Sequence, residues 1–343
     1  MVLIFCLLGL HRLKFKLALP KHLPPGLGFV LIGIISLILT PLNLSLTESA
    51  ISFSYILRFF LYLLFGWTVY SGAFPKIKMN IAKIFISSGI GLAIIGLLQL
   101  VFLPNLEFLR SLGWDPHFFR TVSTFLDPNF AGAYFVLTFL LLTEKKYQKI
   151  FLILTFAALL TTFSRSAYLM FLISGLTLSY LKKSKVLAFS FVILFLILLA
   201  GFYTYGELVA KPRSINREQS ASFRLNTWQQ GLTIFEKNPI FGVGFNAYKY
   251  ALREYKLADV QFLDSRGSSS NDSSILFILS TTGLIGFIIY SLFIITLVKS
   301  SLKNNFIFVS GLCGLLIHSF FANSLFYPFI LIWIFLISGQ DRV

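Results

Sequence analysis

Long apolar runs, separated by short polar connections, make up most of the chain. A helix needs roughly 20 apolar residues to cross the hydrocarbon of a bilayer, and many of the runs approach this length. The pattern therefore predicts an all-α fold, a polytopic transmembrane helical bundle of about 10–12 spans. We expect ten of the spans over residues 27–46, 50–70, 81–103, 130–143, 150–163, 167–181, 186–205, 273–298, 305–321 and 325–338.

One connection is long and polar. Residues 206–272 are expected to form a loop outside the bilayer, within a single integral membrane domain that covers residues 1–343. No internal repeat and no break in the middle of a span is visible in the sequence. Four apolar residues in the loop recur at the spacing of an amphipathic helix, which an Asn-Pro pair would end: Phe223, Trp228, Leu232 and Phe235.

Composition and charge set the class and the orientation. Hydrophobic residues make up 57% of the chain and charged residues 12%, whereas a soluble domain carries about 25% charged residues. The net charge of +16 comes largely from short connections: one side holds sixteen Lys and Arg, the other three. The positive-inside rule places the richer side in the cytoplasm. We therefore predict a multi-pass membrane protein, surrounded by lipids, with no nucleic-acid partner.

The sequence offers no motif for a metal or a cofactor. The two cysteines lie within apolar segments, and no cluster of carboxylates or histidines has the spacing of a metal site. We therefore expect neither a bound metal nor a cofactor.

Three arginines lie in polar motifs on the side that has few lysines: Arg120, Arg165 and Arg224. A bilayer tolerates such cations where they face water or an anion, which suggests a phosphate-bearing substrate. Arg120 precedes the turn Asp127-Pro128-Asn129, in which Asn129 is a candidate N-cap. A turn and a cap would explain the rest of this motif but do not need a cation. Arg120 and Asn129 are therefore candidate substrate-binding residues.

The second motif, Ser164-Arg165-Ser166, is a very tight connection between two predicted spans. An arginine that only extends to the membrane interface is the alternative. Hydroxyl groups flank the cation on both sides, which favours a site, with Arg165 catalytic and Ser164 in contact with the substrate. His318, near the end of a later span, is expected to have a structural hydrogen bond.

The third motif runs from Arg224 and Trp228, which share a helix face, to Gly242-Val-Gly244 and Asn246. The two glycines are not a dinucleotide fingerprint, because no βαβ unit surrounds them. The order of these residues along the chain, from Arg224 to the glycines, is a stronger indication of a functional site than the glycines alone. We expect Arg224 to act in catalysis and Trp228 and Asn246 to contact the substrate.

The fourth motif, Ser270-Asn271-Asp272, precedes a span that contains Gly283 and Gly286. Either Asn271 or Asp272 can cap that helix, and the glycines suit close helix packing. Asp272 is also a candidate catalytic base. Ser270 and Asn271 are candidate substrate-binding residues.

Taken in order, these four motifs resemble the O-antigen ligase and O-antigen polymerase superfamily, over a family-like core of residues 120–338. The resemblance implies a membrane glycosyltransferase of the GT-C kind in lipopolysaccharide and other cell-envelope polysaccharide biosynthesis. Its donor is a glycan linked to undecaprenyl diphosphate at the outer face of the cytoplasmic membrane. Its acceptor is lipid A-core for a ligase or another carrier-linked glycan for a polymerase. The family's phosphate-binding arginines match Arg165 and Arg224.

One departure from the family bears on the acceptor. Ligases have a His just before the Asn of the fourth motif, where this chain has Ser270. A serine is not a base near neutral pH without help, which favours a polymerase, with Asp272 as the base or no strong base at all. A transporter or flippase for the same lipid-linked sugar is the main alternative function, and a non-catalytic membrane scaffold is a third.

Overall fold

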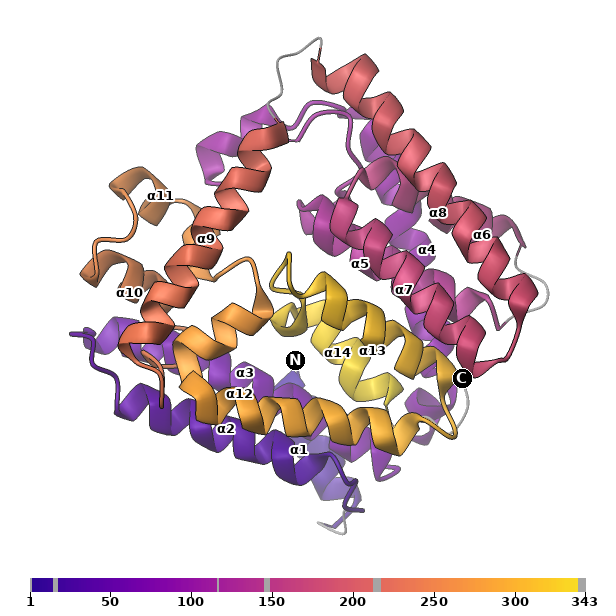
Figure 1. Cartoon of the computed structure of the whole chain (residues 1–343). Helices are drawn as coiled ribbons and strands as arrows, with labels where there is room; N and C mark the ends of the chain where they lie inside the picture. The colour runs from indigo at the N-terminus through magenta and orange to yellow at the C-terminus, as the bar shows by residue number, and fades with distance from the viewer. Residues whose placement is uncertain (1, 15–17, 116, 145–148, 212–216, 339–343) are drawn as a thin grey trace. The chain divides into compact units, whose positions relative to one another are not determined.

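A computed structural model describes residues 2–14, 18–115, 117–144, 149–211 and 217–338 (Figure 1). Across these residues the regular secondary structure is helical, apart from an isolated antiparallel bridge between Asn105 and Phe118. The α-helices are α1 (Val2–Arg12), α2 (Leu23–Ile38), α3 (Leu46–Tyr70), α4 (Pro75–Phe102), α5 (Pro128–Leu142), α6 (Lys149–Thr162), α7 (Arg165–Leu181), α8 (Lys185–Tyr205), α9 (Arg217–Lys237), α10 (Tyr248–Glu254), α11 (Val260–Asp264), α12 (Ser274–Ser301), α13 (Phe306–His318) and α14 (Pro328–Ile337). The shorter elements are η1 (Glu107–Leu112), η2 (Ser123–Phe125), η3 (Gly206–Ala210), η5 (Arg266–Ser269) and η6 (Ser324–Phe326).

The predicted polytopic helical fold is confirmed. Each of the ten expected apolar segments overlaps with one of the helices α2 to α8 or α12 to α14. In the described part of the chain, four helical segments are long and apolar enough to cross a bilayer, and shorter apolar helices accompany them. The four are Leu46–Tyr70, Pro75–Phe102, Lys185–Ala210 and Arg266–Ser301.

The chain forms two compact units, which are described separately. The first contains Met1–Asn80, Arg224–Asn304 and Pro328–Asp341, and the second contains Ile81–Phe223 and Asn305–Tyr327. In the first unit, α2 packs on α3 and α12, and α3 also contacts α1 and α14. Aromatic rings fill this core in edge-to-face pairs, the arrangement that ring quadrupoles favour: Phe29, Phe59, Tyr290, Phe293 and Phe335.

In the second unit, α7 packs on α5, α8 and α13. All residues of α5 from Ala131 to Leu142 are buried. A Cβ atom added at Gly132 would come within 2.6 Å of the Ala167 Cβ. Small residues at these two positions therefore allow α5 and α7 to pack closely at the end where the α6–α7 connection lies.

Helix α12 is broken at Gly283, whose φ of 64° and ψ of −167° are not helical. The prediction that this span is continuous was wrong, because the loop between α9 and α10 satisfies the backbone groups that the break exposes. Such groups need partners within the protein when they lie in a bilayer. Four backbone hydrogen bonds make the connection: Val243 N to Ser280 O, Gly244 N to Thr281 O, Leu284 N to Pro239 O and Ile285 N to Ile240 O, at 3.0, 3.0, 2.8 and 3.4 Å.

Glycine is required on both sides of this connection. Gly242 has a φ of 69° and lies directly against the backbone of Thr281 and Thr282, and Gly283 lies directly against the backbone of Ile240. A side chain at either glycine would therefore overlap with backbone atoms. In the span after the fourth motif, Gly283 is thus required for the backbone conformation, while Gly286 has the helix-packing role that we expected.

Helix α9 confirms the predicted helix of the long loop, and it ends at Lys237, before the Asn-Pro pair. The residues that α9 buries are not the apolar residues whose spacing indicated the helix. Thr227, Gly231 and Ile234 are buried, whereas Phe223 and Leu232 are 44% and 45% exposed. The small residues on the buried face allow the segment before α12 to approach closely. The spacing of the large apolar residues therefore did not indicate which residues of α9 are buried.

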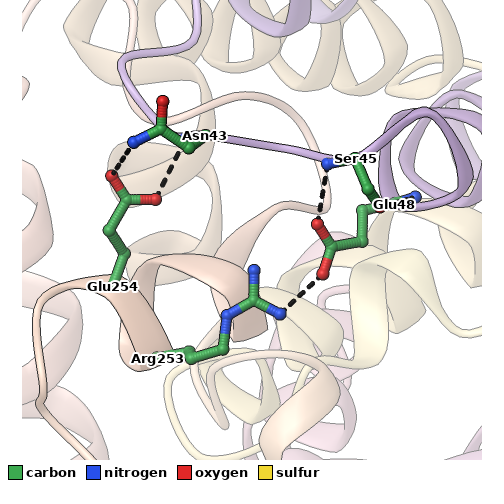
Figure 2. Close-up of polar contacts among 5 residues, drawn as sticks. All are labelled: Asn43, Ser45, Glu48, Arg253 and Glu254. Carbon is green, nitrogen blue, oxygen red and sulfur yellow. Dashed lines mark hydrogen bonds and ion pairs between the residues drawn. The ribbon is translucent and has the colours of Figure 1, made fainter.

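Polar contacts attach α10 to the connection between α2 and α3 in the first unit (Figure 2). The Arg253 guanidinium pairs with Glu48 at 2.6 Å, and Glu254 accepts hydrogen bonds from the backbone and side-chain nitrogens of Asn43 at 3.0 and 3.3 Å. Glu48 also forms a capping box with Ser45 at the start of α3. The long loop is thereby fastened at α10 as well as at the α12 break.

Candidate functional site

The connection between α6 and α7 gathers several predicted site residues of the second unit. Ser164 is the N-cap of α7, and its Oγ donates a hydrogen bond to Asn129 Oδ1 at 2.7 Å. Ser166 Oγ lies 3.1 Å from Ser164 Oγ and 3.3 Å from His318 Nε2. These side chains form a chain of hydrogen bonds that joins α5, the connection and α13. The hydrogen bond expected for His318 is present, and His318 is fully buried.

Arg120 is bound to the end of α6. Its Nε donates to the Thr162 carbonyl oxygen at 2.8 Å, and its Nη2 donates to the Phe163 carbonyl oxygen at 3.3 Å. A cation is favourable at a helix C-terminus, where the last carbonyls lack intrahelical partners and the helix dipole is negative. This contact gives Arg120 a structural explanation that the sequence did not reveal.

Arg165 is placed differently. It is the first residue of α7, it is exposed, and its guanidinium carbon lies 5.9 Å from the centre of the Phe202 ring. The N-terminus of a helix is its positive end, and the first turn of α7 contains no acidic residue. Helix stability alone would favour an anion at this position. A cation at the positive end of a helix therefore makes this a suitable place for an anionic ligand.

The second cluster, in the first unit, lies where α9, α10 and the start of α12 meet; we call it the α9–α12 junction. Asn271 is fully buried there. Its Nδ2 donates to the Thr227 carbonyl oxygen at 2.5 Å and to Tyr248 Oη at 3.0 Å, and its Oδ1 accepts from the Ser273 backbone at 2.8 Å. Asn271 therefore connects three elements through one side chain.

Asp272 and Arg224 meet the same residue of α9. Thr227 Oγ1 lies 2.9 Å from the Arg224 carbonyl oxygen and 3.4 Å from Asp272 Oδ2, and it can donate to either. Asp272 and the Arg224 side chain are both partly buried. Arg224, the candidate phosphate ligand, lies one turn before Thr227 on α9. Asp272, the candidate base, contacts Thr227, so the two residues meet neighbouring turns of one helix.

The remaining predicted site residues of the first unit lie at separate positions along the chain. Trp228 is partly buried on α9, on the turn after Arg224, as the four-residue spacing indicated. Asn246 has a φ of 61°, a left-handed conformation in which Asn is favoured, and this backbone role explains the residue without a ligand. Ser270 is partly buried and extended, at the end of η5.

Both capping predictions need correction. The N-cap of α5 is Asp127, whose Oδ1 accepts from the backbone nitrogens of Asn129 and Phe130 at 2.6 and 3.2 Å. The N-cap of α12 is Ser273, so neither Asn271 nor Asp272 has that role. Asn129 and Asn271 instead use their side chains in contacts with distant segments. Burial raises the pKa of Asp127, although the two backbone donors and Arg120 oppose this effect.

Sequence reasoning missed four residues that make up the two clusters: Ser166, Thr227, Gly231 and Tyr248. Ser166 stood in a motif but was treated only as a neighbour of Arg165. Thr227 and Gly231 lie three and seven residues after Arg224, on the face of α9 that small residues mark. Tyr248 gave no local signal, because its partner Asn271 is 23 positions away in sequence.

Among the described residues, no group of three or more His, Cys, Asp or Glu side chains is close enough to hold a metal ion. Arg120 and Arg165 belong to the second unit and Arg224 to the first. The convergence of all three arginines on one substrate therefore stays a prediction.

The architecture and the apolar composition define a multi-pass membrane protein. Residues 150–291 match the family model described as O-antigen ligase, which confirms the resemblance that the motifs suggested. The matched region contains Arg165, Arg224 and Asp272, together with the α12 break. Residues 150–291 are therefore similar to the O-antigen ligase family, and this likeness supports membrane-associated glycan processing as the function in outline. No curated protein sequence matches the chain significantly.

Proposed function

We propose that the protein is a membrane glycosyltransferase that transfers or polymerises glycan from an undecaprenyl-diphosphate-linked donor at the outer face of the cytoplasmic membrane. The match of residues 150–291 to the O-antigen ligase family carries this proposal, because that region contains Arg165, Arg224 and Asp272. The sixteen-to-three asymmetry of basic residues in the short connections supports the orientation.

In the proposed reaction, a hydroxyl oxygen of the acceptor attacks the anomeric carbon of the donor sugar. The bond between that carbon and the phosphate oxygen breaks, and its electron pair leaves with the undecaprenyl diphosphate. The proton of the acceptor hydroxyl passes to the carboxylate of Asp272. The acceptor is a second carrier-linked glycan in a polymerase and a lipid such as lipid A-core in a ligase.

Arg165 and Arg224 bind the diphosphate in this proposal. Negative charge grows on the diphosphate as the bond breaks, and a positioned donor stabilises it, with effects on the order of 10²–10³ in rate for one good donor. The planar guanidinium suits phosphate oxygens better than an ammonium does. The exposure of Arg165 at the positive end of α7 supports its role. The reaction needs no metal in this scheme, because arginines neutralise the leaving group.

The other predicted residues have supporting roles. Ser164 and Asn129 hold the connection that presents Arg165, and Trp228, Asn246 and Ser270 are proposed to line the path of the glycan. Asn271, a candidate for substrate binding from the sequence, is fully buried and hydrogen-bonded within the protein, which favours a structural role. Arg120 stays a candidate for substrate binding, although its contact with the end of α6 favours a structural role.

A transporter of the same lipid-linked sugar is the second candidate. The break in α12 favours it at first sight, because broken helices are common in transporters. In this protein, however, the loop between α9 and α10 satisfies the backbone groups at the break. This fixed connection leaves those groups occupied, and the enzyme is the better-supported function.

The test uses purified protein in liposomes that contain undecaprenyl-diphosphate-linked repeat units, with a chelator present. Products are separated on a gel for the wild type and Arg224→Ala, with Arg266→Ala, at an exposed position of the same loop, as the control. A ladder of longer lipid-linked glycans that only Arg224→Ala abolishes would establish a metal-independent polymerase.

Other outcomes separate the alternatives. Transfer that appears only after lipid A-core is added would indicate a ligase. Movement of the lipid-linked sugar across the bilayer, with no transfer to any acceptor, would contradict the proposal and establish the transporter.

A further inference from the structure

Tyr248 lies at the centre of the α9–α12 junction, outside every motif that the sequence singled out. Its side chain is fully buried. Its Oη accepts a hydrogen bond from Asn271 Nδ2 at 3.0 Å and donates one to the Thr227 carbonyl oxygen at 3.4 Å. Burial raises the pKa of the Tyr248 hydroxyl, which therefore stays protonated and able to donate at physiological pH. A neutral hydroxyl that donates and accepts at once can hold two elements in a fixed arrangement.

The same arrangement is enforced from the other side of Asn271. A Cβ atom added at Gly231 would come within 2.8 Å of Asn271 Nδ2. Glycine at this position lets the Asn271 amide reach the backbone of α9 one turn earlier, at Thr227. Asn271 is thus held between α9 and Tyr248, and Asp272 follows it directly in the chain.

We propose that Tyr248 is a positioning residue that acts through Asn271 to hold the Asp272 carboxylate against Thr227, one turn from Arg224. This inference rests on the proposed function, in which Asp272 accepts the proton of the acceptor. Tyr248 itself does not touch the substrate. It fixes the peptide that precedes Asp272, so that the Thr227 hydroxyl can donate to the carboxylate.

The groups around Asp272 determine what loosening this contact should do. Tyr248 on α10 is a titratable side chain that interacts electrostatically with Asp272, and Arg224 is a charged residue one turn before Thr227 on α9. A hydrogen bond from Thr227 stabilises the charged form of the carboxylate. Loss of this bond therefore makes the carboxylate easier to protonate, and the acid limb of the activity profile should move to higher pH.

The experiment measures kcat against pH for glycan transfer in liposomes by the full-length protein. Tyr248→Phe removes the hydroxyl alone, and Thr227→Val removes the donor to Asp272 directly. We expect a loss in kcat of about 10-fold for Tyr248→Phe, as for residues that orient catalytic groups, with the KM for the donor changed less than about twofold. Both variants should move the acid limb to higher pH, Thr227→Val by more.

The matched control is Tyr255→Phe. Tyr255 directly follows α10, and its Oη accepts a hydrogen bond from Asn238 at 2.9 Å. This variant should keep the wild-type kcat and pH profile. If Tyr248→Phe behaves like Tyr255→Phe while the wild type is active, the inference is wrong and the proposed function stands. If the wild type transfers no glycan to any acceptor, the proposed function fails and the inference fails with it.

Gly231→Ala keeps the test decisive if Tyr248→Phe does not fold. The added methyl group displaces Asn271 from α9 without changing any hydrogen-bonding group. The same shift of the acid limb is expected. An unchanged profile in folded Gly231→Ala would overturn the inference.

Discussion

The α6–α7 connection and the α9–α12 junction each present one arginine, but they hold it in different ways. At the α6–α7 connection, side chains bind one another in a buried chain from Asn129 to His318. At the junction, a single side chain, Asn271, binds the backbone of α9 and the hydroxyl of Tyr248. The connection is only two residues long between its helices, whereas the junction joins segments more than forty residues apart.

The comparison also separates the arginines by what they contact. Arg120 binds the final carbonyls of α6, which is a contact that stabilises the fold. Arg165 is exposed at the positive end of α7. Arg120 contacts the α6–α7 connection from a distant segment and Arg165 follows it directly, yet the two cations have different expected roles. The lesson is that the position of an arginine relative to a helix end distinguishes structure from function better than its motif does.

The largest expected effect on stability comes from the break in α12, which follows the α9–α12 junction along the chain. Gly283→Ala should destabilise the protein by about 4 kcal/mol or more, because φ near 64° with ψ near −167° is essentially restricted to glycine and the new Cβ would overlap the Ile240 backbone. Thermal unfolding in detergent measures this. Gly91→Ala is the control, since no atom lies within 4 Å of the added Cβ, and its change should stay within about 1 kcal/mol. Equal effects of the two changes would refute the role of the break.

The next effect concerns Arg165. Arg165→Ala should lower kcat for glycan transfer by about 10²–10³ with little change in thermal stability, because an exposed side chain that stabilises the leaving group is lost. Arg165→Lys should restore only part of the rate, since an ammonium lacks the planar fork. A full rate in Arg165→Ala would show that this arginine only extends to the membrane interface.

Arg120→Ala should show the opposite behaviour in thermal unfolding. We expect a loss of about 1–2 kcal/mol in the free energy of unfolding, because two carbonyls at the end of α6 lose a charged donor. Arg110→Ala, at an exposed position of the same unit, is the control and should change stability by less than about 0.5 kcal/mol. A stability of Arg120→Ala equal to that of the control would contradict the structural role.

The smallest effect is expected at α10, where Arg253 pairs with Glu48 (Figure 2). The Arg253 side chain is 51% exposed, and exposed ion pairs contribute about 0.2–1 kcal/mol. Arg253→Ala should therefore shift thermal unfolding slightly, and the difference from wild type should shrink as salt is raised. A large shift that does not depend on salt would mean that α10 is held mainly by this pair rather than by Tyr248.

The sequence predicted where the helices lie and pointed to some of the residues in each hydrogen-bonded cluster. Apolar runs located ten helices because bilayer-length hydrophobicity is a strong local signal. The motifs contain Asn129, Ser164 and Asn271, whose side chains make the central hydrogen bonds, while their contact with the substrate stays a prediction. The family resemblance was correct over the region that residues 150–291 now define.

The remaining features depend on contacts that no local pattern encodes. The break in α12 requires backbone hydrogen bonds between residues about forty positions apart, so Gly283 looked like a packing glycine. The capping errors arose because Asp, Asn and Ser suit an N-cap almost equally, and several of them stood side by side at each helix start. The buried face of α9 was missed because small residues, rather than large apolar ones, form it.

The most direct measurement compares Arg120→Ala with Arg165→Ala in one assay. The initial rate of glycan transfer in liposomes is divided by the amount of folded protein, determined by size-exclusion chromatography of the same preparation. The account predicts that Arg165→Ala loses about 10²–10³ of the rate, while Arg120→Ala stays within about threefold of wild type per folded molecule. A large loss in Arg120→Ala together with a near-normal rate in Arg165→Ala would contradict it.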